Sequence, residues 1–306
     1  MNLIRTALVI TSLAASALTS TAITAQPVVE QPLAAELGSS SARPALWQVS
    51  DDDTTIYLFG TIHLLPTGID WYNGNVAQAF EGSQELVTEI PEVPEDQAMT
   101  VSMRMALLPP GETLRSQMTS AERSKFEAAL AELQIPETGL DNLKPWFASV
   151  VLATAPLTRA GYGLDSGVEA QLDKRNKELG RPRSGLETLE YQLGIFNALS
   201  PQAQKSYLFE TIDALPTIPQ EIGKMVAAWT KGDAAALAAL LNDEMDDPAL
   251  YRALLTDRNR NWSAWIDDRL NRPGTVFIAV GAGHLGGKDS VQDFLGKAGI
   301  KVVRVQ

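Results

Sequence analysis

The two histidines of this sequence are the residues whose type and spacing most clearly predict chemistry. His63 and His284 are the only histidines, and each is the last residue of a Gly-x-x-His motif. Each motif follows a short apolar run typical of a buried strand, at residues 56–59 and 276–280. Functional groups in an open parallel sheet gather just beyond the carboxyl ends of the strands. Two imidazoles delivered there from opposite ends of the chain predict one shared site, of which metal binding is the expected chemistry. For either histidine alone, a hydrogen-bonded structural role is the alternative.

Two glutamates are the carboxylates expected in this site. Glu89 lies at the end of an apolar strand expected at 85–90, where an unpaired carboxylate is costly, although a strand-end glutamate facing water is the alternative. Glu187 is the second candidate, but Ser184-x-x-Glu187 also has the spacing of a helix capping box. Imidazoles and carboxylates suit Zn, Mn, Fe or Co, and spacing does not choose among them. A divalent ion held by these residues would lower the pKa of bound water, with a carboxylate as general base.

Other catalytic chemistries lack their motifs in this sequence. The chain has no cysteine, which excludes thiol catalysis and disulfide bonds. It contains no Gly-x-Ser-x-Gly, phosphate-binding loop or His-Glu-x-x-His motif. Gly281-x-Gly283 resembles the start of a dinucleotide fingerprint, but His284 follows and the third glycine is misplaced. The pattern favours a loop whose glycines let the backbone approach a ligand.

The elements that must position these residues alternate between strand and helix at both ends of the chain. Alternation and turn residues predict, in order, a strand at 45–49, an acidic turn at 50–53, a strand at 55–60, a helix at 75–81 and a strand at 85–90. The C-terminal end shows the same alternation, with a strand expected at 275–280, a helix at 290–298 and a strand at 300–305. We therefore expect an α/β fold with a mostly parallel or mixed sheet, formed by a core of residues 44–91 and 272–306.

Helical periodicity dominates the stretch from about 95 to 270, which we interpret as a large helical insertion. Apolar stripes and caps predict helices at 97–108, 119–133, 143–157, 168–179, 187–199, 201–213, 218–231 and 233–242, and a long helix from Asp247. Arg258 falls on the apolar face of that last helix. A guanidinium there needs a buried carboxylate or a bound ligand, unless its stem covers apolar surface and its head reaches water.

Net charge argues against two classes of partner. The chain carries a formal charge of -12 with a pI near 4.7, so it would repel both a phosphate backbone and an anionic membrane surface. Residues 1–25 have the pattern of a secretory signal, with Arg5, an apolar run at 7–18 and small-residue cleavage sites. Residues 26–43 look like a flexible leader. We expect a soluble periplasmic or extracellular protein with no stable membrane insertion after signal removal.

Seven stretches together resemble the TraB/GumN family, which includes the animal Tiki proteases. They occur in order at residues 44–50, 58–66, 85–89, 143–146, 185–190, 256–262 and 280–287. The resemblance implies an α/β core with a helical insertion, related to the erythromycin-esterase-like and ChaN-like folds. For the Tiki branch it implies a metal-dependent peptidase.

The resemblance also implies roles for individual residues. His63, Glu89 and His284 match the metal-site positions, and Arg258 with Asn259 matches an Arg-Asn pair that would orient substrate or stabilise an oxyanion. The chain has Gly167-Val168-Glu169 where the family commonly has Gly-Val-Asp. Because the extra methylene would displace a carboxylate ligand, we expect no defined role for Glu169.

These observations predict a secreted metallohydrolase with Mn, Co or Zn in its site, and a peptide or protein as its substrate. One alternative is a non-catalytic protein that binds a metal or haem through its histidines. Another is a module whose helical insertion binds a peptide partner. Convergence of both histidines with Glu89 is the feature that separates the first hypothesis from the others.

Overall fold

The computed structural model describes residues 41–242 and 247–306. The expected signal at 1–25 and most of the leader at 26–43 lie outside these residues. The described chain forms two compact units. The helical unit comprises residues 93–161 and 189–221, and the sheet unit comprises the described parts of 30–92, 162–188 and 222–306. Each unit is described by itself below.

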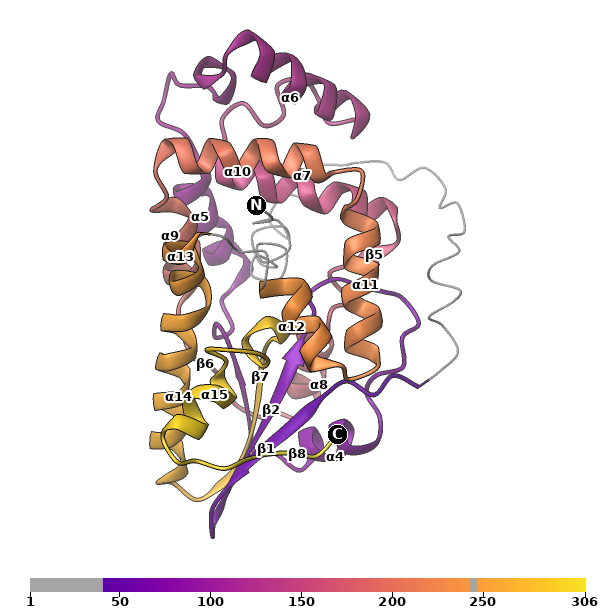
Figure 1. Cartoon of the computed structure of the whole chain (residues 1–306), viewed down its shortest axis with the longest axis vertical. Coiled ribbons are helices and arrows are strands. Elements are labelled where there is room, and N and C mark those ends of the chain that lie inside the picture. Colours follow the sequence, from indigo (N-terminus) through magenta and orange to yellow (C-terminus); the bar gives the residue numbers. More distant parts are fainter. Residues whose placement is uncertain (1–40, 243–246) are drawn as a thin grey trace. The chain divides into compact units, whose positions relative to one another are not determined.

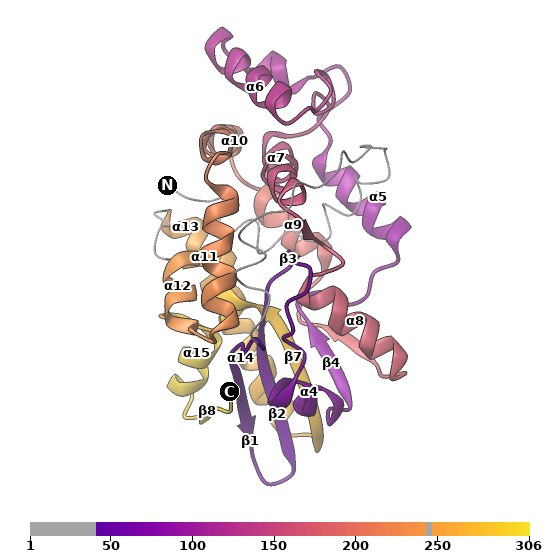
Figure 2. The same cartoon turned by 90° about the vertical axis from the view of Figure 1, so that its right-hand side faces the viewer.

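The sheet unit is built on a six-stranded mixed sheet with the order β6-β4-β7-β2-β1-β8 (Figures 1 and 2). Its strands are β1 (Leu46–Ser50), β2 (Thr54–Thr61), β4 (Glu85–Thr88), β6 (Arg183–Gly185), β7 (Gly274–Gly281) and β8 (Val302–Arg304). The four strands β6, β4, β7 and β2 run parallel, whereas β1 and β8 pair antiparallel at one edge. The predicted α/β fold with a sheet made from both ends of the chain is confirmed.

Short-range signals explain the edge of the sheet, and long-range pairing explains its centre. The predicted hairpin forms because Asp51 accepts hydrogen bonds from the backbone of Asp53 and Thr54, which closes the acidic turn between β1 and β2. The predicted β-α-β unit is present as β2, α4 (Gly74–Glu81) and β4, but β7 lies between its two strands. Strand β7, from near the C-terminus, therefore lies between two strands from the N-terminal part of the chain.

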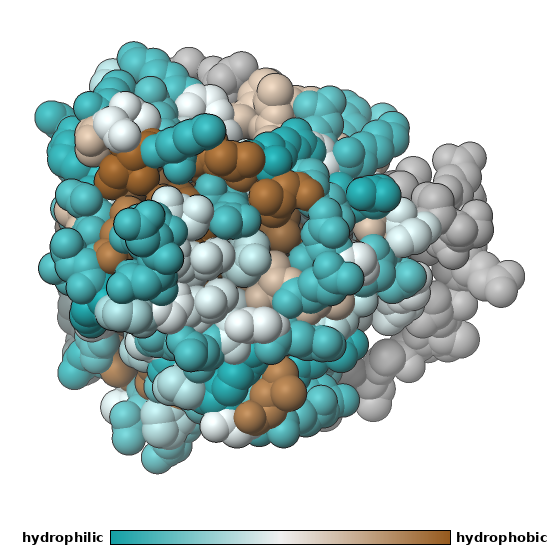
Figure 3. Space-filling model, turned by 90° about the horizontal axis from the view of Figure 1, so that it is seen from below, coloured by the Kyte–Doolittle hydropathy of each residue, from teal (hydrophilic) through white to brown (hydrophobic). Residues whose placement is uncertain are grey.

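Alternating side chains bury both faces of this sheet. Ile56 and Leu58 face a cluster that includes Trp262 and Ile266 of α14 (Asp257–Leu270), together with residues of α15 (Val291–Lys297). On the opposite face, Phe59 contacts the aromatic rings of Trp71, Trp229 and Phe277. The surface in Figure 3 is mainly hydrophilic, with hydrophobic residues in a few small groups. Packing on both faces holds in place the parallel strands whose carboxyl ends carry the candidate residues.

The remaining elements of the sheet unit are short strands and helices. They are β3 (Leu65–Pro66), β5 (Tyr162–Gly163), α8 (Val168–Glu178), α12 (Ala234–Asn242), α13 (Pro248–Tyr251) and a π-helical turn (Arg252–Thr256) that leads into α14. Helix α11 (Ile218–Thr230) begins in the helical unit and continues into the sheet unit. Asp247 accepts backbone hydrogen bonds from Ala249 and Leu250, so the predicted N-cap is present.

The helical unit consists of helices that pack through aromatic side chains. It contains α5 (Glu95–Ala106), α6 (Ser120–Glu132), α7 (Pro145–Arg159), α9 (Leu189–Asn197) and α10 (Pro201–Ala214). Trp146 of α7 stacks on Phe196 of α9, which stacks on Tyr207 of α10. A capping box formed by Thr119 and Glu122 begins α6, the helix predicted at 119–133.

The predicted helical insertion from about 95 to 270 has a more complex organisation. Its helices form near their predicted positions, but they are divided between the two units, and the stretch also contributes β5 and β6. Among residues 41–242 and 247–306, no helix is long and apolar enough to span a bilayer.

Candidate functional site

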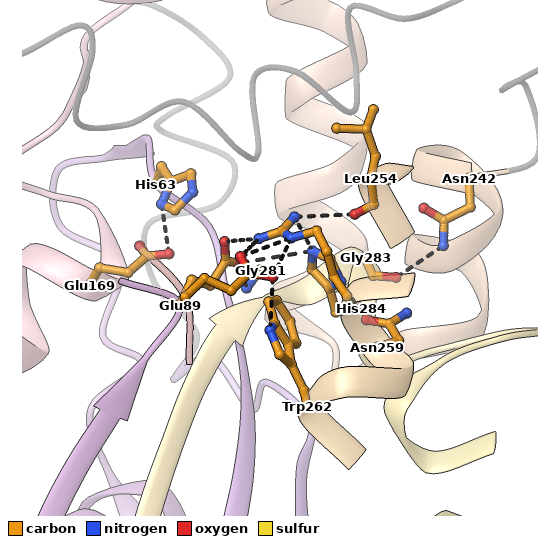
Figure 4. Close-up of polar contacts among 12 residues, drawn as sticks. His63, Glu89, Glu169, Asn242, Leu254, Asn259, Trp262, Gly281, Gly283 and His284 are labelled. Carbon is orange, nitrogen blue, oxygen red and sulfur yellow. Dashed lines mark hydrogen bonds and ion pairs between the residues drawn. The ribbon is translucent and has the colours of Figure 1, made fainter. Parts of the chain in front are cut away.

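The four parallel strands each deliver one candidate residue at the same edge of the sheet. His63 follows β2, Glu89 follows β4, His284 follows β7 and Glu187 follows β6, all within three residues of the strand end. In the order of the strands across the sheet, β6 carries Glu187, β4 carries Glu89, β7 carries His284 and β2 carries His63. Parallel sheets present functional groups at the carboxyl ends of their strands. Figure 4 shows the polar contacts among the residues that gather there.

Arg258 of α14 is the centre of this cluster. Its guanidinium is fully buried and lies 2.7 Å from Oε2 of Glu89 and 2.9 Å from Oε2 of Glu187. Its Nε also donates to both carboxylate oxygens of Glu187, each at 3.0 Å. The remaining nitrogen, Nη1, lies 3.1 Å from Nε2 of His284 and 3.1 Å from the carbonyl oxygen of Leu254. The buried-carboxylate partner predicted for Arg258 is confirmed, with two carboxylates in place of one.

The tautomer of His284 is fixed from both sides of its ring. Because a guanidinium can only donate, Nε2 of His284 accepts from Arg258. Nδ1 therefore carries the proton, and it lies 2.6 Å from Oδ1 of Asn259. The amide of Asn259 is oriented in turn, since its nitrogen donates to the carbonyl of Asp289 at 2.8 Å. Asn259 thus holds His284 with Nε2 directed at Arg258 and Glu89.

His63 has a matching arrangement that sequence reasoning missed. Its Nδ1 lies 2.6 Å from Oε1 of Glu169, in the first turn of α8. The chain brings them together because Val168 donates its backbone N–H to the carbonyl of Ile62, which seats the start of α8 on the end of β2. The expectation that the extra methylene leaves Glu169 without a role is therefore wrong about its placement, because the longer side chain reaches His63. The Gly-Val-acid pattern before a helix was the signal that could have found it.

Glu187 has a different local role from the one that its spacing suggests. Ser184 donates its hydroxyl to Glu85 at 2.5 Å, so the predicted Ser184–Glu187 capping box is wrong. Glu187 instead accepts from Arg258 and, at 3.0 Å, from the indole N–H of Trp262. Trp262 also packs against the imidazole of His284, with ring centroids 4.4 Å apart. Trp262 is therefore part of the site.

Burial and charge fix the protonation states at the centre of the site. Burial alone would raise the pKa of Glu89, but the positive charge of Arg258, with smaller contributions from His284, His63 and the Gly281 N–H, lowers that pKa to about 2. For His284, burial and then the charge of Arg258 lower the pKa to about 3. Glu89 is therefore an anion and His284 a neutral imidazole near neutral pH.

The predicted site residues accordingly lie together, although not all in one contact shell. Nε2 of His284 lies 3.9 Å from Oε1 of Glu89, and Arg258 touches both. His63 and Glu169 lie on the other side of Glu89 from His284 (Figure 4). Asn259 contacts His284 and is 1% exposed.

The chemistry of the donor set fits a divalent ion. Both histidines hold Nδ1 against an oxygen acceptor, as metal-binding histidines do, and Glu89 is ionised. Among the described residues, no three carboxylates or imidazoles converge as a ready-made metal centre. Arg258 contacts one oxygen of Glu89 and Nε2 of His284. The donor atoms are thus of the kind that binds a divalent ion, and the guanidinium of Arg258 lies among them.

Comparison with known proteins identifies the family. No curated protein and no solved structure matches the chain. A family model described as TraB/PrgY/gumN family matches residues 45–304 of the 306, which includes every residue of the site. The resemblance found in the sequence motifs is confirmed over nearly the whole chain. The chain therefore belongs to the TraB/PrgY/gumN family.

Proposed function

We propose that this protein is a metal-dependent hydrolase that cleaves peptide bonds. The observation that supports it best is the common orientation of the two histidines. Each places Nδ1 beside an oxygen, of Glu169 or Asn259, so a metal ion would have to be bound through Nε2 of both rings. Purely structural histidines have no need to share this orientation at adjacent strand ends.

His63, Glu89 and His284 would hold the divalent ion, and Zn, Mn or Co are the expected metals. When bound, such an ion supplies Lewis-acid polarisation of a carbonyl and acidifies a water. Asn259 and Glu169 fix the tautomers of the two histidines. Arg258 supplies a permanent positive charge beside Glu89, where it can stabilise an oxyanion.

The carboxylates of the site are suited to different roles. Glu89, with a pKa of about 2, is a weak proton acceptor, so we assign it to cation binding. Glu187 neutralises Arg258 and keeps it in position. Both carboxylate oxygens of Glu169 are buried, and Oε1 lies 2.6 Å from Nδ1 of His63, so we assign Glu169 to holding that imidazole in position.

The substrate class and the location rest on sequence alone. A peptide or protein substrate follows from the resemblance to the Tiki branch. Secretion follows from the pattern of residues 1–25, and fractionation of expressing cells with mass analysis of the mature N-terminus tests it. A mature chain that retains those residues in the cytoplasm would contradict secretion.

The first experiment is elemental analysis of protein titrated with Zn²⁺, Mn²⁺ or Co²⁺, followed by hydrolysis of a peptide library. We expect about one equivalent in the wild type and loss of that metal in both His63→Ala and His284→Ala. Glu81→Gln, an exposed acidic residue of α4, is the control and should keep the metal. Equal metal in the histidine variants, or none in the wild type, would reject the shared site. Metal binding without hydrolysis of any peptide would favour a non-catalytic metal-binding protein.

A further inference from the structure

Arg258 and a metal ion would require the same two atoms. The guanidinium binds Oε2 of Glu89 at 2.7 Å and Nε2 of His284 at 3.1 Å, which are donor atoms of the proposed metal site. An imidazole nitrogen has a single lone pair, so Nε2 cannot accept from Arg258 and bind a metal at the same time. Any metal bound through His284 must therefore displace this contact.

Arg258 has other partners that it keeps when this contact is lost. Nε donates to both oxygens of Glu187, and Nη2 lies 2.9 Å from Oε2 of the same carboxylate. Nη1 also donates to the carbonyl of Leu254, which belongs to the π-helical turn before α14. Turns of this kind are uncommon and occur frequently at functional sites. Glu187 and Leu254 thus form a second anchor that shares no atom with the metal donors.

The charges of the cluster favour exchange of one cation for another. Glu89 and Glu187 carry two negative charges and Arg258 carries one positive charge, while His284 accepts from Arg258 through an Nε2 that therefore bears no proton. The buried group is left with a net negative charge that attracts a further cation. A divalent ion would neutralise Glu89 while Glu187 continues to neutralise Arg258.

We propose that Arg258 is a resident competitor of the divalent ion, holding Glu89 and His284 until the ion replaces it and Arg258 is retained by Glu187. This inference rests on the proposed metal site. Metal affinity then depends on how strongly Arg258 binds Glu89 and His284, because the ion has to replace those two contacts. The consequence is that removing Arg258 tightens metal binding, although the residue lies within the site.

The test is equilibrium dialysis with Mn²⁺ and Zn²⁺ on the full chain and three variants. We expect Arg258→Gln to bind about ten- to a hundredfold more tightly, the range that groups around a metal site contribute. Arg258→Lys retains the charge, but a single ammonium cannot donate to Glu187, Glu89 and His284 as the planar fork does, so a smaller increase is expected. Arg260→Gln removes the same charge from the surface of the same helix and should leave affinity unchanged.

A second readout requires no metal. With only two histidines, ¹⁵N NMR resolves both imidazoles. In Arg258→Gln and Arg258→Lys, the Nε2 resonance of His284 should move toward that of an unbonded nitrogen, whereas His63 keeps its spectrum. Equal or weaker metal binding in both variants, with metal still bound by wild type, would overturn the competition and leave the proposed function standing. Absence of metal binding in every variant would reject the metal site and this inference with it.

Discussion

Nδ1 of His63 lies 2.6 Å from Oε1 of Glu169, and this contact joins the end of β2 to the first turn of α8. The same nitrogen of His284 lies 2.6 Å from Oδ1 of Asn259 in α14. The two imidazoles follow neighbouring strands, and each contacts a side chain of a helix, α8 for His63 and α14 for His284. Site geometry therefore depends on two helix-to-strand contacts as well as on the sheet.

Replacement of Glu169 should lower the metal affinity of the site that contains His63 without unfolding the protein. Glu169→Gln retains an acceptor oxygen but removes the charge that stabilises the Nδ1–H tautomer, and Glu169→Ala removes both. We expect a loss of about ten- to a hundredfold in metal affinity, larger for alanine. Glu178→Gln, at the exposed far end of the same helix, is the control. Metal affinity equal to wild type in both Glu169 variants would contradict the assignment.

Asn259 makes the corresponding prediction for His284. Asn259→Leu fills a similar volume but leaves the buried Nδ1–H without its acceptor, so the ring orientation of His284 is held from the Arg258 side alone. A metal-affinity loss of about ten- to a hundredfold is expected, with a change in the ¹⁵N spectrum of His284 and not of His63. Asn271→Leu, at the exposed C-cap of the same helix, should retain wild-type values. A wild-type His284 spectrum in Asn259→Leu would show that the amide does not set the tautomer.

Most of the candidate site could be predicted from the sequence because its residues follow strands. His63, Glu89 and His284 each end an apolar run, and parallel strands bring such ends together. Glu169 could not be placed in this way. Its contact depends on how α8 is seated on the carbonyl of Ile62, and this tertiary geometry leaves no period in the sequence.

The fold divides between local and long-range information in the same manner. Helix positions follow from apolar stripes and caps, such as Asp247, which are properties of a few neighbouring residues. Strand order is not local, since β7 pairs between β2 and β4 although it follows them by more than half of the chain. The capping box at Ser184 failed for a related reason. A buried arginine 71 residues away along the chain is a stronger partner for Glu187 than a backbone N–H.

Removal of Glu187 should destabilise the protein strongly, because Arg258 then keeps a buried charge with one carboxylate fewer. Breaking a buried ion pair by removing one partner costs about 3–5 kcal/mol, so the free energy of unfolding of Glu187→Ala should fall by this amount. Glu190→Ala removes an exposed glutamate whose nearest arginine lies 3.9 Å away, and should cost about 0–1 kcal/mol. Urea denaturation measures both, and similar losses in the two variants would contradict a buried pair at Glu187.

The stability of the chelator-treated protein should fall as the pH is lowered from 6.5. His284 has a pKa of about 3 in the folded chain against an ordinary 6.5, so the unfolded chain binds the proton first. Stability is therefore lost between pH 6.5 and about 3, at up to about 1.4 kcal/mol per pH unit. Glu89, with its pKa lowered from 4.5 to about 2, adds a loss in the same direction only below pH 4.5.

Urea denaturation between pH 7 and 4.5 isolates the contribution of His284. His284→Gln cannot take up the proton and should lack this part of the pH dependence, whereas His63→Gln should retain it. A variant curve parallel to that of wild type over this range would mean that His284 is already protonated, or equally exposed, in the folded protein. Such a parallel curve would contradict the burial of a neutral His284 beside Arg258.

Gly167 sets the close approach of α8 to His63, and alanine there should disturb both stability and metal binding. Its φ of -61° and ψ of 152° suit any residue, so strain in the backbone is not the issue. A Cβ would instead overlap the carbonyl oxygen of His63 and crowd that of Leu164. We expect Gly167→Ala to lose at least about 1–3 kcal/mol of stability, as overpacked sites do, and to lower metal affinity.

Gly296→Ala in α15 is the control. Its Cβ would meet nothing within 4 Å, so thermal unfolding should show a neutral or slightly stabilising change, since alanine favours a helix. Wild-type stability and affinity in Gly167→Ala would show that α8 can shift without moving Glu169 from His63.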